Sequence, residues 1–291
     1  MAGDATDEVV VRVARPDDAA ECGRICYAAF ETVNEAHGFP VDFPVPEIAV
    51  ELLGMMFSHP GYYCVVAEMG GRLVGSNCLD ERSGISGVGP ITIDPQVQNR
   101  GVGRKLMTAV LDRAASRGAA GVRLVQAAFH CRSLSLYADL RFDVREPLAC
   151  MQGQTAQRSV AGCEVRMATA ADVVACNALA QRVHGFDRGV DLQHAVERGA
   201  AKVVEREGRV TGYASELAFF GHATTESNAD MQALLASAES FGGPGILVPS
   251  RNSELFRWCL ANGLRVTQPM TLMSRGMYRE PAGVWLPSVV F

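Results

Sequence analysis

The sequence lacks the features that mark membrane, secreted and nucleic-acid-binding proteins. Its 291 residues contain no stretch of about 18 apolar residues, the length that a membrane-spanning helix needs. The formal net charge is -5, whereas binding to a nucleic-acid backbone needs a clustered excess of lysine and arginine. The first ten residues carry three acidic side chains and no apolar segment of the kind found in signal peptides. We therefore expect a cytoplasmic protein without a membrane or nucleic-acid partner.

The nine cysteines form no recognisable framework. No C-x-x-C pair occurs, and the spacing matches neither a zinc ribbon nor a disulfide scaffold. In a reducing compartment such cysteines serve most simply as small buried apolar side chains. We therefore expect no metal centre.

Two short segments of the first half recur in the second half. Val11–Cys22 aligns without gaps on Val165–Cys176, and both have the pattern of a strand that turns into a helix, with an aspartate able to cap that helix. Gly71–Gly75 resembles Gly208–Gly212, and each is a turn between two β-rich stretches. These repeats predict a duplicated architecture.

The chain has enough length and apolar content for two domains. Hydrophobic residues make up 48% of it, and about 150 residues are usual for one domain. A polar stretch interrupts the apolar pattern near the middle. We predict domains over residues 1–152 and 163–291, joined by a linker over 153–162. Hairpins and strand–helix–strand units occur together, which predicts an α+β fold (mixed α/β) with helices packed on a central sheet.

One segment of the first half predicts an anion site. A β-rich stretch ends at Pro95, Gly101 and Gly103 follow in a tight turn, and apolar spacing predicts a helix over 103–117. Glycines let main-chain N–H groups face a ligand, and the helix N-terminus adds partial positive charge. Three cations flank the turn: Arg100, Arg104 and Lys105. That much positive charge is typical of a site for more than one phosphate.

Two well-known phosphate loops do not fit this turn. A P-loop needs serine or threonine where Leu106 stands. A dinucleotide fingerprint needs glycine at the same position and a place in an early strand–helix unit. The turn is therefore neither of these two loops: it is an anion-binding loop of another class or an ordinary glycine loop.

The turn resembles the cofactor motif of the GNAT superfamily of acetyl-CoA-dependent N-acetyltransferases. Gln98–Gly103 is similar to the family pattern R/Q-x-x-G-x-G/A between a strand and a helix. Downstream, Leu136–Phe142 resembles the family segment L-Y-x-x-L-G-F, with Arg141 in place of glycine. The order and separation of the two motifs make the pair more specific than either motif alone.

The resemblance implies a fold and a co-substrate. Each half would be a GNAT-like domain with a mixed, mainly antiparallel sheet flanked by helices. Acetyl-CoA would donate its acetyl group to an acceptor amine by direct attack, without a metal. The residues that the resemblance assigns to the cofactor are Ile91, Thr92, Ile93, Gln98, Asn99, Arg100, Gly101, Val102, Gly103, Arg104, Lys105 and Ser133.

The resemblance also implies catalytic residues. Tyr137 would protonate the departing thiolate, or it would merely pack on its helix. His130 stands where the family usually has asparagine; it would shuttle a proton, or be held by local hydrogen bonds at a strand end. The family's usual basic glutamate is missing from the preceding strand. Asp80 and Glu81, or a water chain, would replace it as the base, unless the two carboxylates are simply exposed loop residues.

Acidic side chains predict where the acceptor enters. Residues 1–58 hold eleven acidic residues against three arginines, a field that attracts a small cationic amine, although a solvated surface has the same composition. We expect the acceptor beside the first two helices, predicted over 17–30 and 47–57, and the loop 32–43. The candidate acceptor-binding residues are Glu31, Glu35, His37 and Asp80, with Asp42 in the same loop.

The second half looks like a degenerate copy. Asn252–Leu264 resembles the Tyr137 segment, with the family glycine at Gly263 but without the tyrosine. The helix predicted over 228–238 lacks both G-x-G and flanking cations, so this half should not bind coenzyme A. Its expected role is to complete the acceptor pocket or to cover the first half.

We expect an N-acetyltransferase that acts on a small-molecule amine, as a monomer or homodimer. Two alternatives remain open. One is a non-catalytic acyl-CoA-binding sensor, which the missing base favours. The other is a protein-lysine or N-terminal acetyltransferase, which the acidic charge suits equally well.

Overall fold

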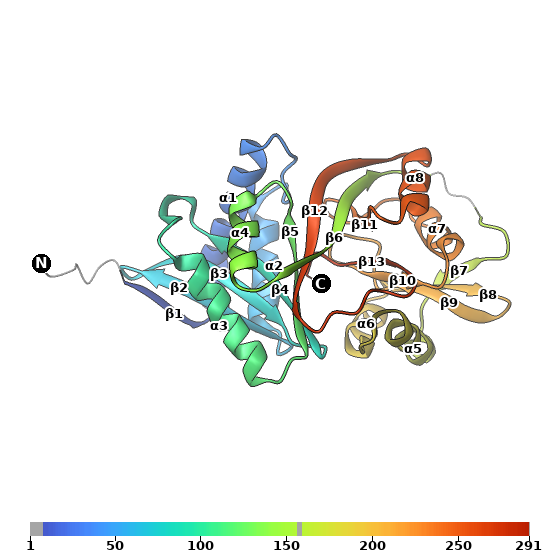
Figure 1. The fold of residues 1–291 in the computed structure, drawn as a ribbon, viewed down its shortest axis with the longest axis horizontal. Coiled ribbons are helices and arrows are strands. Elements are labelled where there is room, and N and C mark those ends of the chain that lie inside the picture. The colour runs from blue at the N-terminus through green and yellow to red at the C-terminus, as the bar shows by residue number, and fades with distance from the viewer. Residues whose placement is uncertain (1–7, 156–158, 291) are drawn as a thin grey trace, which may run out of the picture. The chain divides into compact units, whose positions relative to one another are not determined.

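The computed structural model describes residues 8–155 and 159–290 (Figure 1). The strands are β1 (Val9–Val13), β2 (Tyr62–Met69), β3 (Arg72–Asp80), β4 (Ile85–Ile93), β5 (Gly121–Ala127), β6 (Asp143–Gly153), β7 (Glu164–Met167), β8 (Lys202–Arg206), β9 (Arg209–Ala214), β10 (Ala223–Thr225), β11 (Ile246–Pro249), β12 (Leu264–Gly276) and β13 (Val284–Leu286). The α-helices are α1 (Ala19–Ala36), α2 (Pro46–Ser58), α3 (Val102–Ser116), α4 (Cys131–Asp139), α5 (Val173–His184), α6 (Gly189–Glu197), α7 (Asn228–Ala236) and α8 (Ser253–Ala261). Short 3-10 turns are η1 (Pro16–Asp18), η2 (Pro95–Val97) and η3 (Ala170–Asp172).

The described residues form two compact units. Unit 1 comprises residues 8–81 and Ser86–Val122, and unit 2 comprises Arg82–Ile85 and the described part of 123–289. Both are mixed α/β with mainly antiparallel sheets flanked by helices, as the sequence predicts. No helix of the described residues combines the length and the apolar character that crossing a membrane requires.

Unit 1 is a sheet of neighbouring strands β1, β2, β3 and β4, covered by helices on both faces. All three pairings are antiparallel. Cys78 of β3 packs into the apolar cluster formed with α1 and α2. The adjacent Asn77 points to the other face, where its amide lies 3.5 Å from the Leu106 carbonyl of α3. This alternation, which is the period of a strand, fixes which helix covers which face.

Unit 2 holds two sheets. Their strand orders are β5-β12-β6-β11 and β13-β10-β9-β8-β7. In the first sheet the final strand of each repeat is exchanged: β6 pairs with β11, and β12 lies between β5 and β6. The compact units therefore do not end where the sequence repeat ends. The predicted domains over 1–152 and 163–291 describe the two copies of the sequence repeat, and these bounds stay a prediction.

The two copies share one ion-pair arrangement. Arg12 of β1 contacts the carboxylates of Asp18 and Glu68, each at 2.7 Å. The corresponding residues of the second copy are Arg166, Asp172 and Glu205. The hydrogen bond from Arg12 is the main cause that lowers the pKa of Asp18 below its usual value. The Asp18 carboxylate accepts a hydrogen bond from the Arg15 N–H at 2.7 Å, so it caps the η1 turn that precedes α1. Its side chain makes no capping hydrogen bond to α1 itself.

Each of the two hairpins, β2–β3 and β8–β9, has a β-bulge at the same position. The register shifts between Ala67 and Glu68 in β2, and between Val204 and Glu205 in β8. A Cβ at Gly75, beyond the first bulge, would lie 2.5 Å from the Thr92 carbonyl oxygen. Gly212 stands at the same place in the second hairpin, where a Cβ would collide with Thr225. Close approach of neighbouring strands therefore requires glycine in both copies.

Two segments differ from the sequence prediction. The first helix continues to Ala36, so five of the twelve residues of the expected loop 32–43 are helical, because residues 31–37 contain neither glycine nor proline. The first residues of the expected linker are ordered parts of the fold. Gly153 is the last residue of β6, and the Thr155 hydroxyl lies 3.2 Å from the Leu235 carbonyl. Residues 156–158 of that linker lie outside the described residues.

The residue two positions past the end of α4, Arg141, corresponds to Gly263 past the end of α8 in the second copy. Arg141 has φ +69°, a left-handed conformation that strains non-glycine residues, and Gly263 past α8 has φ +94°. We predict that Arg141→Gly stabilises the fold by about 1 kcal/mol and raises Tm by about 2 °C. Gly263→Ala should destabilise it by more, because its Cβ would also lie 2.6 Å from the Gln154 carbonyl oxygen. Thermal unfolding measures both, and a lower Tm for Arg141→Gly would contradict the strain.

Candidate active site

The predicted anion turn forms as expected between η2 and α3. Asp94 caps η2 by accepting from the Gln96 N–H at 2.9 Å. Gly101 is the N-cap residue of α3 with φ +80°, and no atom lies within 4 Å of the place of a Cβ. The first hydrogen bond of α3 runs from the Lys105 N–H to the Gly101 carbonyl at 3.1 Å. The N–H groups ahead of it face out of the helix end, the arrangement that binds anions.

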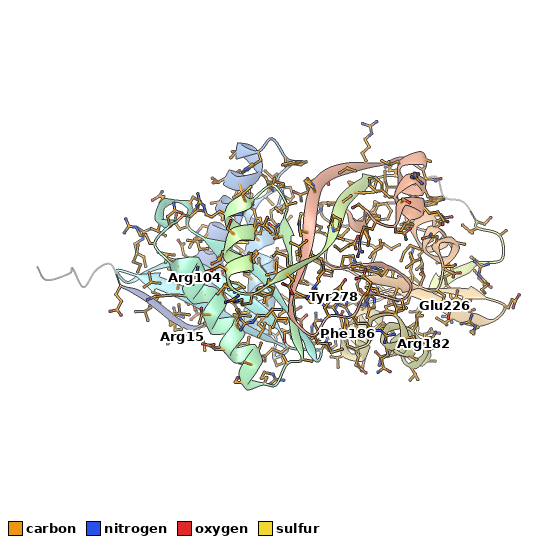
Figure 2. The ribbon with its side chains drawn as sticks, viewed as in Figure 1. Arg15, Arg104, Arg182, Phe186, Glu226 and Tyr278 are labelled. Carbon is orange, nitrogen blue, oxygen red and sulfur yellow. The ribbon has the colours of Figure 1, made fainter. Side chains whose placement is uncertain are left out.

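The three cations of the turn differ in their setting. Arg100 and Arg104 are exposed, and Figure 2 labels Arg104 on α3. The Lys105 ammonium instead donates to the Val9 carbonyl of β1 at 2.8 Å. Asn99 adds a second left-handed residue to the turn, with φ +69°. Sequence reasoning did not identify this conformation at Asn99, although asparagine adopts it more readily than most residues.

The last three residues of β4, Ile91, Thr92 and Ile93, lie shortly before the turn. Ile91, Thr92 and Ile93 pair with Asn77, Ser76 and Gly75 of β3. A register shift inserts Gly89 and Pro90 just before this stretch. The Thr92 side chain is buried inside unit 1. Of these three residues, the main chain is therefore the part suited to a ligand.

Tyr137 lies on α4, in unit 2. Its side chain is buried, and its ring packs edge-on against Phe142 with centroids 6.1 Å apart. Burial raises the pKa of the phenol above its ordinary value. The hydroxyl is therefore protonated at neutral pH, as a general acid must be.

His130 and Ser133 open the same helix. His130 is the N-cap residue of α4 and does not end a strand, which corrects the structural alternative considered for it. The Ser133 hydroxyl lies 2.9 Å from the His130 carbonyl and 3.1 Å from Oε1 of Gln126. These contacts hold the first turn of α4, which begins at Cys131 and ends at Asp139.

The candidate acceptor residues come from two elements of unit 1. Glu31 and Glu35 lie near the C-terminal end of α1, and His37 is its C-cap residue. The Glu31 carboxylate accepts from the Tyr27 hydroxyl at 2.8 Å, and Nδ1 of His37 lies 2.7 Å from the Val33 carbonyl. The candidate Asp80 instead ends β3, half-buried.

Glu81 is not an exposed loop residue. Its carboxylate receives Arg113 at 2.7 Å and lies 3.5 Å from Arg117, and its side chain is only 7% exposed. The expectation of exposure is therefore wrong, because α3 supplies two partners that the linear sequence does not reveal. A carboxylate paired in this way is a poor candidate for the missing base.

The described residues contain no group of three or more His, Cys, Asp and Glu side chains placed to hold a metal ion. The four cysteines of unit 1 that pack between α1, α2 and the sheet are buried and free: Cys22, Cys26, Cys64 and Cys78.

Comparisons with known proteins agree with the motif. The family model "Acetyltransferase (GNAT) family" matches residues 28–142, which include the turn, α3 and α4. No curated protein sequence matches significantly.

Solved structures share the fold over nearly the whole chain. A protein from Pyrococcus horikoshii assigned as an acetyltransferase is 16% identical, with TM-score 0.74, covering 98% of this chain and 95% of its own. A GCN5-related N-acetyltransferase from Sphaerobacter thermophilus is 15% identical, with TM-score 0.62 and coverage of 95% and 98%. A tandem GNAT protein from the clavulanic acid biosynthesis pathway is 13% identical, with TM-score 0.55 and coverage of 92% and 98%.

At these identities the structural likeness concerns the fold, and the family model supplies the family. Residues 28–142 therefore match the GNAT family of acetyltransferases, within a chain that shares its fold with GNAT acetyltransferases, among them a tandem GNAT protein.

Proposed function

We propose that the protein transfers the acetyl group of acetyl-CoA to the primary amine of a small, cationic acceptor. The single observation that carries this proposal is the left-handed Gly101 at the N-terminus of α3, inside the region that the family model matches. GNAT acetyltransferases use acetyl-CoA, and this turn is where the sequence resembles their cofactor motif. The acceptor and the roles of individual residues are our inference.

The turn suits the pyrophosphate of the co-substrate. The open space beside Gly101 lets a phosphate approach the main chain, and a side chain there would occupy that space. The N–H groups of Val102 and Gly103 would donate to the phosphate, and Gln98 and Asn99 would border it. Arg100 and Arg104 would add charge from the exposed side of the turn, while Lys105 would contribute from its place beside β1.

The equivalent helix of the second copy has a different N-terminus. Ser227 is the N-cap residue of α7, and its hydroxyl lies 2.5 Å from the carboxylate of Asp230. Asp230 is 2% exposed and also accepts from Arg206 at 3.1 Å. A protein carboxylate thus stands at the helix end, where the partial positive charge would otherwise attract phosphate. This supports a single acetyl-CoA site, in the first half.

Tyr137 is the proposed general acid. When the acceptor nitrogen bonds to the thioester carbonyl carbon, the carbon–sulfur bond breaks and Tyr137 gives its proton to the departing sulfur. The raised pKa keeps the phenol protonated until that moment. The acceptor nitrogen loses a proton as the amide forms, and His130, at the start of the same helix, is the residue proposed to take it.

We predict that Tyr137→Phe lowers kcat for thiol release from acetyl-CoA by about 100-fold, the size of a general-acid contribution. The KM for acetyl-CoA should change less than twofold, because the hydroxyl does not hold the nucleotide. Tyr63→Phe is the matched control: it removes a phenol from β2, where Arg113 stacks on the ring, and should leave kcat unchanged. A full kcat in Tyr137→Phe would assign the tyrosine to packing, and turnover with no amine would favour the non-catalytic sensor.

We predict that Glu31→Gln with Glu35→Gln raises the KM for a cationic amine about three- to tenfold at low salt. The effect should shrink at high salt, because ions screen exposed charges. Asp112→Asn, an exposed carboxylate on α3, is the control and should leave the KM unchanged. An unchanged KM in the double variant would place the acceptor elsewhere.

A further inference from the structure

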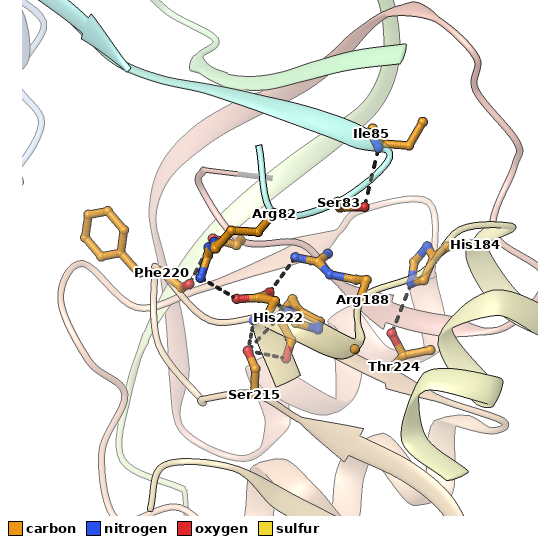
Figure 3. Close-up of polar contacts among 12 residues, drawn as sticks. Arg82, Ser83, Ile85, His184, Arg188, Ser215, Phe220, His222 and Thr224 are labelled. Carbon is orange, nitrogen blue, oxygen red and sulfur yellow. Dashed lines mark hydrogen bonds and ion pairs between the residues drawn. The ribbon is translucent and has the colours of Figure 1, made fainter. Parts of the chain in front are cut away.

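A buried pocket of unit 2 lies outside every motif that the sequence revealed. Its lining residues are Arg123, His184, Arg188, His222, Leu272, Trp285, Leu286 and Pro287. They come from β5, β12, β13, the segment from the end of α5 to the start of α6, and the residue just before β10, which lie far apart in the sequence. Figure 3 shows Arg188 and both histidines of this group with their polar contacts. Among the described residues, no acidic side chain lines the pocket.

The carboxylate of Asp191, which is not part of the pocket lining, contacts two residues that are. Asp191 of α6 receives Arg188 at 3.0 Å and Arg82 at 3.1 Å, and lies 3.2 Å from Nδ1 of His222. Burial would raise the pKa of Asp191, but the hydrogen bond from His222 and the two arginines hold it well below its usual value. Asp191 is thus charged, and it positions Arg188 and His222.

Both imidazoles are neutral at physiological pH. Burial is the main cause that lowers the pKa of His222 to about 4, and it lowers that of His184 well below the ordinary value. Nε2 of His184 lies 3.0 Å from the Thr224 hydroxyl. Its Nδ1 is buried and has no hydrogen-bond partner among the described residues. If Nε2 accepts from Thr224, the proton stands on Nδ1, and the pocket holds a donor in need of an acceptor.

Arg123 supplies the permanent charge. It is 3% exposed, and its guanidinium stacks on Phe186 at 4.8 Å and on Tyr278 at 5.1 Å. Burial lowers its pKa to about 10, so it stays charged at neutral pH. Because rings cover its faces, its donors lie in the plane of the fork, where a carboxylate pairs best.

The size and the wall of the pocket define what can enter. Its volume is about 10 Å³, room for one water-sized group. Leu272, Trp285 and Leu286 provide an apolar wall that suits carbon next to a charged end. The pocket therefore takes the tip of a ligand and not a whole metabolite.

We propose that this pocket is a binding site for a carboxylate group, with Arg123 and Nδ1 of His184 as its donors and Arg188 as the second cation. The ligand is a small organic acid, or the carboxylate end of an amino acid. The argument for the site does not rest on acetyl transfer: its residues all belong to unit 2, and the formate-binding test below needs no acetyl-CoA.

Formate, the smallest carboxylate, is the probe. We expect formate to raise the Tm of the full-length protein by about 2 °C or more, through binding to the folded state. Formamide, its neutral isostere, and chloride at equal ionic strength should give no such shift. A shift as large with chloride, or none with formate beyond that with formamide, overturns the proposal.

Variants locate the effect in the pocket. Arg123→Gln and His184→Gln should each abolish the formate shift, and Arg123→Lys should weaken it because the planar fork is lost. Arg182→Gln is the matched control: Arg182 lies on α5, like His184, but is 58% exposed and pairs with Glu226. It should keep the full shift. If Arg123→Gln does not fold, His184→Gln decides, and an unchanged shift in it overturns the proposal.

A final arm identifies the source of the carboxylate. Thiol release from acetyl-CoA is compared for amino acids and their methyl esters, in wild type and Arg123→Gln. A wild-type preference for the free acid that Arg123→Gln loses assigns the carboxylate to the acetyl acceptor. A formate shift without such a preference assigns it to a separate small acid.

Discussion

The antiparallel ladder between β6 and β12 is the interaction on which the rest of the structure depends. It runs from Gly153 paired with Leu264 to Asp143 paired with Ser274. β6 follows the helix that carries Tyr137, and β12 follows the corresponding helix of the second copy. Because buried strand backbones must be paired, each copy completes its sheet with the last strand of the other. The second half is thus part of the scaffold that holds α4.

The two copies of the repeat share some features and differ in others. The shared features are structural, and the differing ones lie at the candidate site. The ion pairs of Arg12 and Arg166, and the glycines beyond the two hairpin bulges, do the same structural work twice. The helix N-termini diverged: α3 begins at a left-handed glycine in open space, whereas α7 begins at a serine bonded to a buried aspartate. Helix N-termini that differ in this way leave one copy open to an anion, as our proposal requires, and close the other with a protein carboxylate.

Local chemistry explains what could be predicted from the sequence. The glycine turn, the helix after it and the repeated strand–turn segments depend on residues within about one helical turn of each other, so glycine and apolar spacing reveal them. The exchange of β6 and β12, the burial of Glu81 against α3 and the pocket around Arg123 depend on contacts between distant segments. His184 and Arg188 gave no signal, because a histidine at a helix end and an arginine in a loop are ordinary when seen alone.

The central claim is that the glycine turn before α3 holds acetyl-CoA, and calorimetric titration tests it most directly. Acetyl-CoA is titrated into the wild type and into the Gly101→Glu, Gly103→Glu double variant, with circular dichroism confirming that both are folded. Our account predicts micromolar binding at one site per chain in the wild type and none in the double variant, whose carboxylates would fill the cradle and repel phosphate. Equal binding by both proteins would contradict the turn as the site, and no binding by a folded wild type would contradict the co-substrate itself.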